Sequence, residues 1–471
     1  MLFNSLAFLV FFPAVCLLYW LLPTKYRNGF LLLASYYFYM SWKPAYGLLI
    51  LFSTLVTWWS GISIGKQPEG RMKKTILLAA LLSNFSLLFF FKYWGFFGES
   101  VNYLLEGWHL RVHFPFSSIL LPIGISFYTF QTVAYVIDVY RKEIEPERDI
   151  LIYALFVSFF PPLVAGPIER AQSLMPQFRL PRSFDDEQFL EGIKTMAWGY
   201  FMKLCIADRI SPYVDAVFDN YRMHNGNSLL LGTFFFTFQI FCDFGGYSLI
   251  AFGAAQCLRF RLTTNFKRPY LSPNVQIFWR RWHCSLSSWF MDYVYIPLGG
   301  NRCRLPRHLL NLLLTFAISG WWHGANWTFL SWGILHGIFM ICSVLIRRVT
   351  PKAKPGGSWR TVMNVVFTFV LVLFGWIFFR ASSMSTAWII LKKIFTEHGA
   401  LYKGQGVPEL LLAFVCIGLL MFKEIKDEMG LNIHFIHSKN TLVGTVSLAL
   451  LIAWILLTGE FSGNAFIYFQ F

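Results

Sequence analysis

The chain has 471 residues, of which 56% are hydrophobic and only 14% are charged. Soluble domains carry roughly 25% charged residues, so this composition excludes an ordinary soluble protein and predicts an integral membrane protein. The net charge of +16 does not indicate nucleic-acid binding, because basic residues of membrane proteins gather in cytoplasmic loops. The apolar runs are long and unbroken, which favours membrane helices over the strands of an outer-membrane barrel.

Residues 1–22 form an apolar run without a basic start or a small-residue cleavage site, so we expect a retained first span and not a signal peptide. The stretch 268–298 is mixed and contains Pro269, Pro273 and Pro297, which favours a re-entrant or interfacial element. We expect about twelve transmembrane helices, with a further apolar segment re-entrant. The candidate spans are 5–22, 28–41, 45–64, 75–97, 116–137, 150–167, 193–218, 228–255, 307–322, 326–346, 362–380, 408–422 and 441–459.

Lysine and arginine gather in several short loops, as is typical of loops on the cytoplasmic side. These residues are Lys25 and Arg27; Lys66, Arg71, Lys73 and Lys74; Arg141, Lys142 and Arg148; and Arg347, Arg348, Lys352, Lys354 and Arg360. One topology places all of these loops inside, and it predicts that both the N-terminus and the C-terminus are extracytoplasmic. The 8 cysteines show no CxxC or zinc-like spacing, so the sequence predicts no metal site.

Polar residues recur in otherwise apolar stretches, where they indicate function by default. His323 lies in Trp322-His323-Gly324, between two apolar segments, and Asn326 follows shortly after. Trp322 and Asn326 are candidates to bind a donor or line a funnel. Because imidazole takes and gives a proton near neutral pH, His323 is the candidate catalytic base. Gly324 would allow a turn or the close approach of another segment. The alternative is a structural histidine, which is our interpretation of His336.

A second polar stretch surrounds another histidine. Its candidate cavity-lining members are Arg280, Arg281, Trp282, His283 and Ser285. One interpretation is an interfacial amphipathic helix with snorkelling arginines. The other is a polar cavity, in which Arg280 and Arg281, together with Arg302 and Arg304, would meet the phosphates of a cytoplasmic donor such as coenzyme A.

Asp243 lies within an apolar span and precedes a glycine pair, Gly245-Gly246. A buried carboxylate needs a partner, and we expect an arginine or the backbone of this glycine-rich turn. Farther upstream, Pro161, Pro162 and Gly166 interrupt another apolar run, which predicts either a helix end or a wall of the same cavity.

Together these motifs resemble the bacterial branch of the membrane-bound O-acyltransferase (MBOAT) superfamily, which contains the alginate O-acetylase AlgI and D-alanyl transferase DltB groups. The AlgI group is the more similar. The matching stretches are 121–127 (LPIGISF), 165–168 (AGPI), Asp243 with 246–248 (GYS), 265–270 (NFKRPY), 282–283 (WH) with 285–287 (SLS), and 322–324 (WHG). The resemblance implies that His323 is the essential histidine and His283 the second one. It also implies an all-α fold, with a ring of tilted helices and re-entrant segments around a central through-membrane funnel.

The chain closes on an aromatic segment, FIYFQF. From the residues alone it is a candidate membrane-interface anchor. In the D-alanylation system that the resemblance brings in, a partner peptide ends in an F-x-Y-x-x-F pattern whose tyrosine is a proposed acyl carrier, and Phe466, Tyr468 and Phe471 match it. We therefore expect a catalytic core over residues 1–380 and a C-terminal transmembrane extension over 381–471 that ends in an extracytoplasmic motif.

The resemblance implies an O-acetyltransferase of the bacterial cytoplasmic (inner) membrane. It would take acetyl groups from a cytoplasmic thioester, with acetyl-CoA as co-substrate and no bound cofactor, for O-acetylation of an exported, alginate-like polysaccharide. An extracytoplasmic SGNH-type acetyltransferase of the AlgJ, AlgX or DltD kind would be the partner. The alternatives are D-alanyl or other acyl transfer to a cell-wall polymer, direct acylation of a lipid or protein, and a transporter. The lack of an evident internal repeat counts against a transporter.

Overall fold

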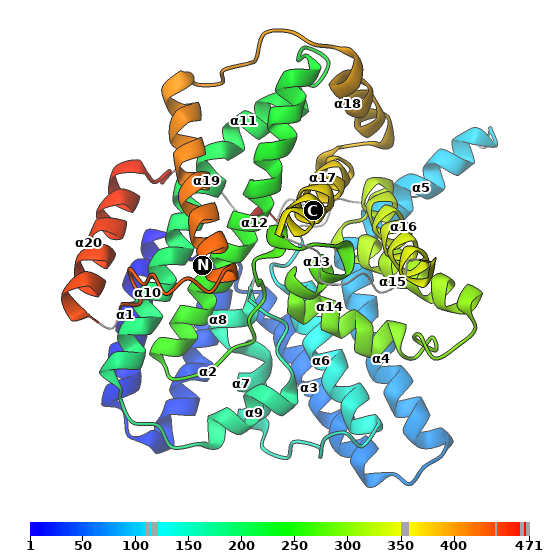
Figure 1. The fold of residues 1–471 in the computed structure, drawn as a ribbon. Helices are drawn as coiled ribbons and strands as arrows, with labels where there is room; N and C mark the ends of the chain where they lie inside the picture. The colour runs from blue at the N-terminus through cyan, green and yellow to red at the C-terminus, as the bar shows by residue number, and fades with distance from the viewer. Residues whose placement is uncertain are drawn as a thin grey trace. The chain divides into compact units, whose positions relative to one another are not determined.

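The computed structural model describes residues 1–109, 114, 121–164, 166–349, 358–438, 440–461 and 466–467. Every regular element in this described part is helical, which confirms the all-helical class (Figure 1). Among the described helices, six are long and apolar enough to cross a membrane: α3, α4, α12, α16, α17 and α20. The expected number of about twelve crossings and the central funnel stay predictions.

The chain forms two compact units. The first comprises Met1–Ile193 and Ala251–Thr263. Its helices are α1 (Leu6–Leu21), α2 (Thr24–Met40), α3 (Tyr46–Lys66), α4 (Arg71–Lys92), α5 (Trp94–Gly107), α6 (Ile125–Tyr140), α7 (Ile150–Ser158), α8 (Phe160–Leu163) and α9 (Ala171–Arg179). Buried hydroxyl and amide groups join them, as is common between membrane helices. The Ser53 hydroxyl donates to Asn84 Oδ1 at 2.6 Å, and the Tyr153 hydroxyl donates to Thr57 Oγ1 at 2.8 Å.

Two predicted spans of this unit are divided in the structure. The expected span 150–167 breaks at Phe159, between α7 and α8. Pro161 and Pro162 have no backbone N–H and a fixed φ, so α7 cannot continue through them. The expected span 75–97 likewise ends at Lys92, and α5 begins at Trp94.

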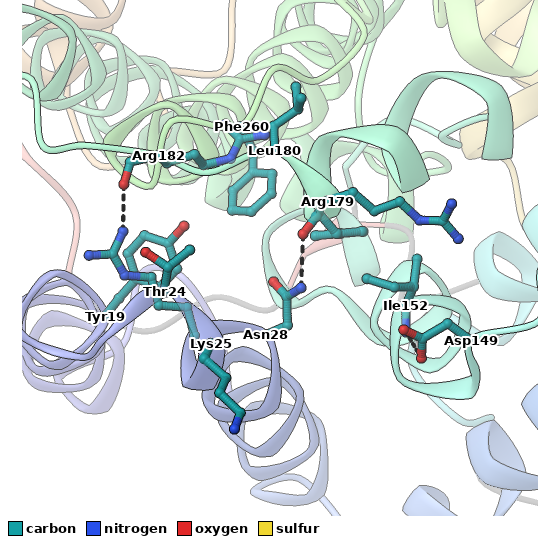
Figure 2. A pocket seen from close by; sticks show the side chains of 12 residues that line it. Tyr19, Thr24, Lys25, Asn28, Asp149, Ile152, Arg179, Leu180, Arg182 and Phe260 are labelled. Atoms are coloured by element: carbon teal, nitrogen blue, oxygen red, sulfur yellow. Dashed lines mark hydrogen bonds between the residues drawn. The ribbon is translucent and has the colours of Figure 1, made fainter.

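A polar cavity of about 310 Å³ lies where the α1–α2 turn meets the segment after α9 (Figure 2). Its polar groups largely bind backbone atoms of the same unit. Arg27 Nη1 donates to the Arg182 carbonyl at 2.7 Å, and Asn28 Nδ2 donates to the Phe178 carbonyl at 2.8 Å. Asp149 caps the N-terminus of α7 through Oδ1, which accepts from the backbone of the next turn. The cavity therefore joins two chain segments within this unit.

The second unit comprises Lys194–Ile250 and Thr264–Phe471. It contains the end of α10 (Asp186–Tyr200), the π-helical turn η1 (Phe201–Ala207), α11 (Asp208–Asp219), most of α12 (Gly226–Cys257), η2 (Pro269–Leu271), α13 (Val275–Arg281), α14 (Cys284–Phe290), η3 (Met291–Tyr295), α15 (Leu305–His323), α16 (Trp327–Val349), α17 (Ser358–Arg380), α18 (Met384–Thr396), α19 (Val407–Glu428) and α20 (Thr441–Thr458). The mixed stretch 268–298 is a series of short helices, and its expected re-entrant or interfacial position stays a prediction. The amphipathic helix α18 was not expected.

Candidate functional site

His283 is fixed by a buried polar network at the start of α14. Its Nδ1 lies 3.0 Å from Asn265 Oδ1, and the same oxygen accepts from the Ser285 hydroxyl at 3.0 Å. The Asn265 amide nitrogen in turn donates to Ser248 Oγ at 3.3 Å. All four side chains are buried. Predicted residues His283 and Ser285 therefore share one partner, Asn265.

This network settles which nitrogen of His283 carries the proton. The backbone N–H of Ser285 points to Asn265 Oδ1 at 3.3 Å and can only donate, so that oxygen is an acceptor. His283 Nδ1 must then be the donor, which leaves the lone pair of the neutral ring on Nε2. The His283 backbone has φ +44°, a left-handed conformation that few residues other than glycine adopt. A backbone strain of this kind is typical of residues whose side chain must take a fixed direction.

His323 is the last residue of α15 and is enclosed by aromatic rings. Its ring centroid lies 5.0 Å from those of Trp322 and Trp332 and 5.3 Å from that of Phe379. The Trp322 ring also lies 6.4 Å from the His283 ring. The two predicted histidines are therefore brought together in one unit, with Trp322 in contact with both.

Close packing of α15 against α16 places His323. A Cβ on Gly320 would lie 3.0 Å from the Gly333 Cα, and a Cβ on Gly333 would overlap the Phe316 carbonyl oxygen. Small residues allow such backbone contact between membrane helices. Gly324 has an extended backbone, with φ −164°, but a Cβ there would overlap the Phe329 ring. Of the two expected roles for Gly324, the structure therefore supports close approach.

Asp243 is buried in α12, and its partners differ from those expected. Its Oδ1 lies 2.6 Å from Lys203 Nζ, and the same ammonium contacts Asp208 Oδ1 at 2.7 Å. Asp243 Oδ2 accepts from the backbone N–H of Ile467 at 2.6 Å. The prediction of an arginine or the glycine-rich turn as partner was wrong, because Lys203 of the π-helical turn forms the ion pair with this carboxylate.

The C-terminal segment enters this same cluster. Phe466 is fully buried, with its ring 4.7 Å from that of Tyr247 and 5.6 Å from that of Phe244. The Phe244 ring lies 4.5 Å from the His283 ring in an edge-on arrangement. Phe466 is therefore a core residue and not an interfacial anchor. Tyr468 and Phe471 lie outside the described residues.

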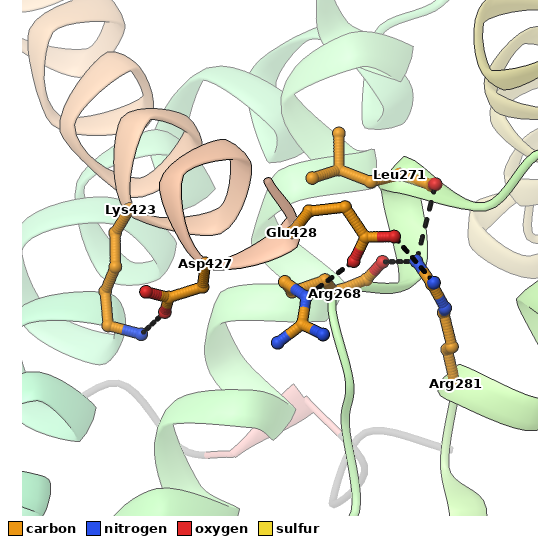
Figure 3. Close-up of polar contacts among 6 residues, drawn as sticks. All are labelled: Arg268, Leu271, Arg281, Lys423, Asp427 and Glu428. Carbon is orange, nitrogen blue, oxygen red and sulfur yellow. Dashed lines mark hydrogen bonds and ion pairs between the residues drawn. The ribbon is translucent and has the colours of Figure 1, made fainter. Parts of the chain in front are cut away.

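Of the two predicted arginines, Arg281 is paired with an acidic side chain, that of Glu428 (Figure 3). Arg281 Nη2 contacts Glu428 Oε1 at 2.7 Å, and Arg268 Nε contacts Glu428 Oε2 at 2.6 Å. A backbone hydrogen bond also joins the two ends of residues 267–281, because Lys267 N donates to the Arg281 carbonyl at 2.9 Å. Arg280 is exposed. A donor phosphate at Arg281 would thus compete with the carboxylate of Glu428.

Burial alone would raise the pKa of Glu428, but the hydrogen bonds from Arg268 and Arg281 outweigh it and leave that pKa below its usual value. Glu428 is therefore ionised at neutral pH.

The structure brings together most, but not all, of the predicted site. One connected set comprises Asp243, Trp282, His283, Ser285, Trp322, His323 and Phe466. Asp243 joins it through the N–H of Ile467, next to Phe466, and the others join directly or through Phe244, Phe266 and Asn265. Asn326 instead has a structural role at the start of α16, since it donates to the Ser382 carbonyl at 3.1 Å and accepts from Thr328 N at 3.0 Å. Sequence reasoning missed Lys203 and Glu428 and gave Asn265 no role. Lys203 carries a charge within an apolar run, a signal that could have found it.

Comparison with known proteins relates the whole arrangement to one family. The family model for MBOAT, the membrane-bound O-acyltransferase family, matches residues 31–384. The chain is 37% identical over 430 residues to the probable alginate O-acetylase AlgI of Azotobacter vinelandii, covering 89% of this chain and 84% of that protein. It is 38% identical over 439 residues to the probable alginate O-acetylase AlgI of Pseudomonas aeruginosa, with 91% and 83% covered.

A relative that acts on another polymer is nearly as similar. The chain is 34% identical over 435 residues to the peptidoglycan O-acetyltransferase of Helicobacter pylori, covering 85% of this chain and 80% of the relative. The family match and these relatives together confirm the resemblance found in the motifs. The chain belongs to the MBOAT family and is a membrane-bound O-acyltransferase.

Proposed function

We propose that this enzyme moves an acetyl group from cytoplasmic acetyl-CoA across the inner membrane for O-acetylation of an exported, alginate-like polysaccharide. One observation carries the proposal. Ile467, the residue before Tyr468, donates to Asp243, while Phe466 packs on Phe244, the ring that contacts His283. Phe466 and Ile467 thus lie beside the residues that surround His283, and they directly precede the tyrosine proposed as acyl carrier.

In this proposal His323 is the base of the first transfer. It takes the proton of the Tyr468 hydroxyl as the phenolic oxygen attacks the thioester carbonyl, and the C–S bond then breaks to give an O-acetyl tyrosine and the coenzyme A thiolate. The proton on His323 passes to that thiolate. Positioned proton transfer of this kind contributes roughly 10²–10⁴-fold to a rate. His283, whose neutral ring is held by Asn265 with its lone pair on Nε2, accepts a hydrogen bond and so orients the reacting groups. A backbone N–H near Gly324 stabilises the negative charge that develops on the carbonyl oxygen.

The second transfer of the acetyl group takes place on the extracytoplasmic side of the membrane. A Tyr ester is a good acyl donor because phenolate is a better leaving group than an alkoxide. With an extracytoplasmic C-terminus, the acetyl tyrosine faces a secreted SGNH-type acetyltransferase, whose serine takes the acetyl group and passes it to the polymer. Alginate is the acceptor suggested by the AlgI relatives, and the Helicobacter pylori relative suggests peptidoglycan as the second candidate.

The test is the intact mass of the C-terminal peptide after purified protein is incubated with acetyl-CoA. Wild type, His323→Ala and Tyr468→Phe are compared, with coenzyme A thiol release measured in parallel. We expect an acetyl adduct on Tyr468 that is absent from both variants. Thiol release that needs His323 but leaves no adduct would remove the carrier role and indicate direct transfer to an acceptor. D-alanyl-loaded carrier protein, supplied in place of acetyl-CoA, tests the alternative donor.

A further inference from the structure

A groove of about 450 Å³ lies between α19 and α20 in the second unit. Both helices pack against the π-helical turn η1, and Phe201 of that turn lies on the groove floor beside Trp198. Figure 1 shows the two helices well separated along this side of the unit. None of the residues that line the groove belongs to the connected set around His283 and His323, so the groove is separate from the proposed acyl-transfer site.

The groove is mainly apolar, and its charged lining residues gather at one end. At the loop between α19 and α20, Lys423, Lys426, His434 and His437 line it together with Phe422, Phe435 and Ile436. The chain enters this loop from α19 and leaves it into α20. Residues with lower numbers on α19 and residues with higher numbers on α20 therefore lie farther from the loop. Those lining residues are Leu419, Leu450, Leu451 and Trp454. Leu450 is 65% exposed, so the apolar part opens to the surface of a helix that is apolar enough to span a membrane.

The polar end carries an excess of positive charge. Lys423 Nζ and Lys426 Nζ share one carboxylate, Asp427, at 3.0 Å each. Lys426 also donates to the Ile433 carbonyl at 2.8 Å, and Lys423 lies over the Trp198 ring at 5.3 Å from its centroid. Two ammonium groups on one carboxylate leave a net charge of +1 on these three side chains. Such a cluster beside α20, a helix apolar enough to span a membrane, attracts anionic lipid headgroups.

We propose that this groove binds an anionic glycerophospholipid, with its phosphate at Lys423 and Lys426 and one acyl chain along Leu450 and Leu451. The order of polar and apolar residues matches the order of headgroup and chain in a single leaflet. The lipid would complete the packing of α20, whose most apolar window is only 11% buried within the protein. This inference does not depend on the acyl-transfer proposal, because lipid binding is measured without turnover.

The test is native mass spectrometry of the full chain in detergent, titrated with dioleoyl phosphatidylglycerol or dioleoyl phosphatidylcholine. We expect a retained phosphatidylglycerol adduct and weaker phosphatidylcholine binding. The double variant Lys423→Gln/Lys426→Gln should weaken phosphatidylglycerol binding by roughly 30-fold, about fivefold per lysine. Ser447→Trp, which fills the groove, should weaken both lipids. Lys392→Gln on α18 removes an exposed lysine elsewhere and should change neither.

Photo-crosslinking of wild-type protein gives an answer that does not depend on how well the variants fold. Phosphatidylglycerol with a diazirine in its acyl chain should label peptides that contain residues 447–454. Labelling spread evenly over all lipid-facing helices would overturn the proposal. So would phosphatidylglycerol affinities of the double variant and of Ser447→Trp that both equal the affinity of the wild type. Equal binding of the two lipids, sensitive only to Ser447→Trp, would overturn the anionic headgroup and leave a neutral lipid as occupant.

Discussion

The carboxylate of Asp243 accepts the backbone N–H of Ile467 at 2.6 Å, a contact between residues 224 positions apart. The same carboxylate is paired with Lys203, so a charged group, its counter-ion and Ile467 meet in one buried place. This contact holds Ile467 through its backbone N–H and not through its side chain.

Removal of Lys203 should destabilise the protein strongly. Asp208 and Asp243 flank its ammonium, and both carboxylate side chains are only 4% exposed. Lys203→Met would leave two buried carboxylates without their counter-ion, for which we expect a loss of about 3–5 kcal/mol in unfolding free energy. Thermal unfolding in detergent measures it, with Lys392→Met as the control for an exposed lysine. Equal melting temperatures for the two variants would contradict the buried pairing.

Asn265 should position His283 for activity. Asn265→Ala removes the acceptor of Nδ1–H and of the Ser285 hydroxyl, so the ring can turn. A misplacement of about 1 Å costs roughly 10²-fold in rate, and we expect that fall in kcat with little change in KM. Ser248→Ala is the matched control, since it removes only the partner of the Asn265 amide nitrogen. Coenzyme A thiol release by purified protein gives both constants, and an unchanged kcat would exclude the positioning role.

The helix pair that places His323 should not tolerate a larger residue at its contact. A Cβ at Gly333 would overlap the Phe316 carbonyl oxygen on α15. Gly333→Ala should therefore cost about 1–3 kcal/mol in stability, as overpacking typically does, and lower activity because His323 ends α15. Gly418→Ala on α19 is the control, because no atom lies within 4 Å of its added Cβ. A Gly333→Ala enzyme as stable and active as Gly418→Ala would be incompatible with the packing described.

The contribution of Glu428 should depend on pH with a definite sign. Its folded-state pKa lies below the usual 4.5, so its stabilisation is present above 4.5 and is lost as the pH falls through the folded value. The difference in melting temperature between wild type and Glu428→Gln should be largest near neutral pH and vanish in acid. The pairs are partly exposed, so each contributes at most about 1 kcal/mol. Glu397→Gln, in an ion pair at a 54% exposed side chain, is the comparison, and a difference that grows in acid would show the sign to be wrong.

Continuous apolar runs made the long helices predictable. The expected spans 228–255 and 307–322 became α12 and α15, with ends shifted by two residues or fewer. The break at Phe159 was less visible, because the residues on both sides of the proline pair are equally apolar. The helix α18 was missed because it is short and amphipathic, so it carries no long hydrophobic run.

The candidate site was predictable where a polar residue stood alone in an apolar setting. His323 and Asp243 were found in this way, whereas His283 was found within a dense polar stretch. Their partners were harder to predict, because a pairing such as Glu428 with Arg281 joins residues 147 positions apart and leaves no local pattern. Glu428 also lies in a charged run at the end of α19, where one carboxylate looks like any other.

The contacts of Glu428 and Ile467 bear on how this enzyme should be handled as a reagent. Both residues come after position 384, where the family match ends. A shortened expression clone designed on that match would keep every motif between residues 121 and 324 but not the C-terminal aromatic motif. It would nevertheless lose the carboxylate between Arg268 and Arg281 and the N–H on Asp243. Such a clone would also lack Tyr468, so its inactivity would carry no information about its histidines.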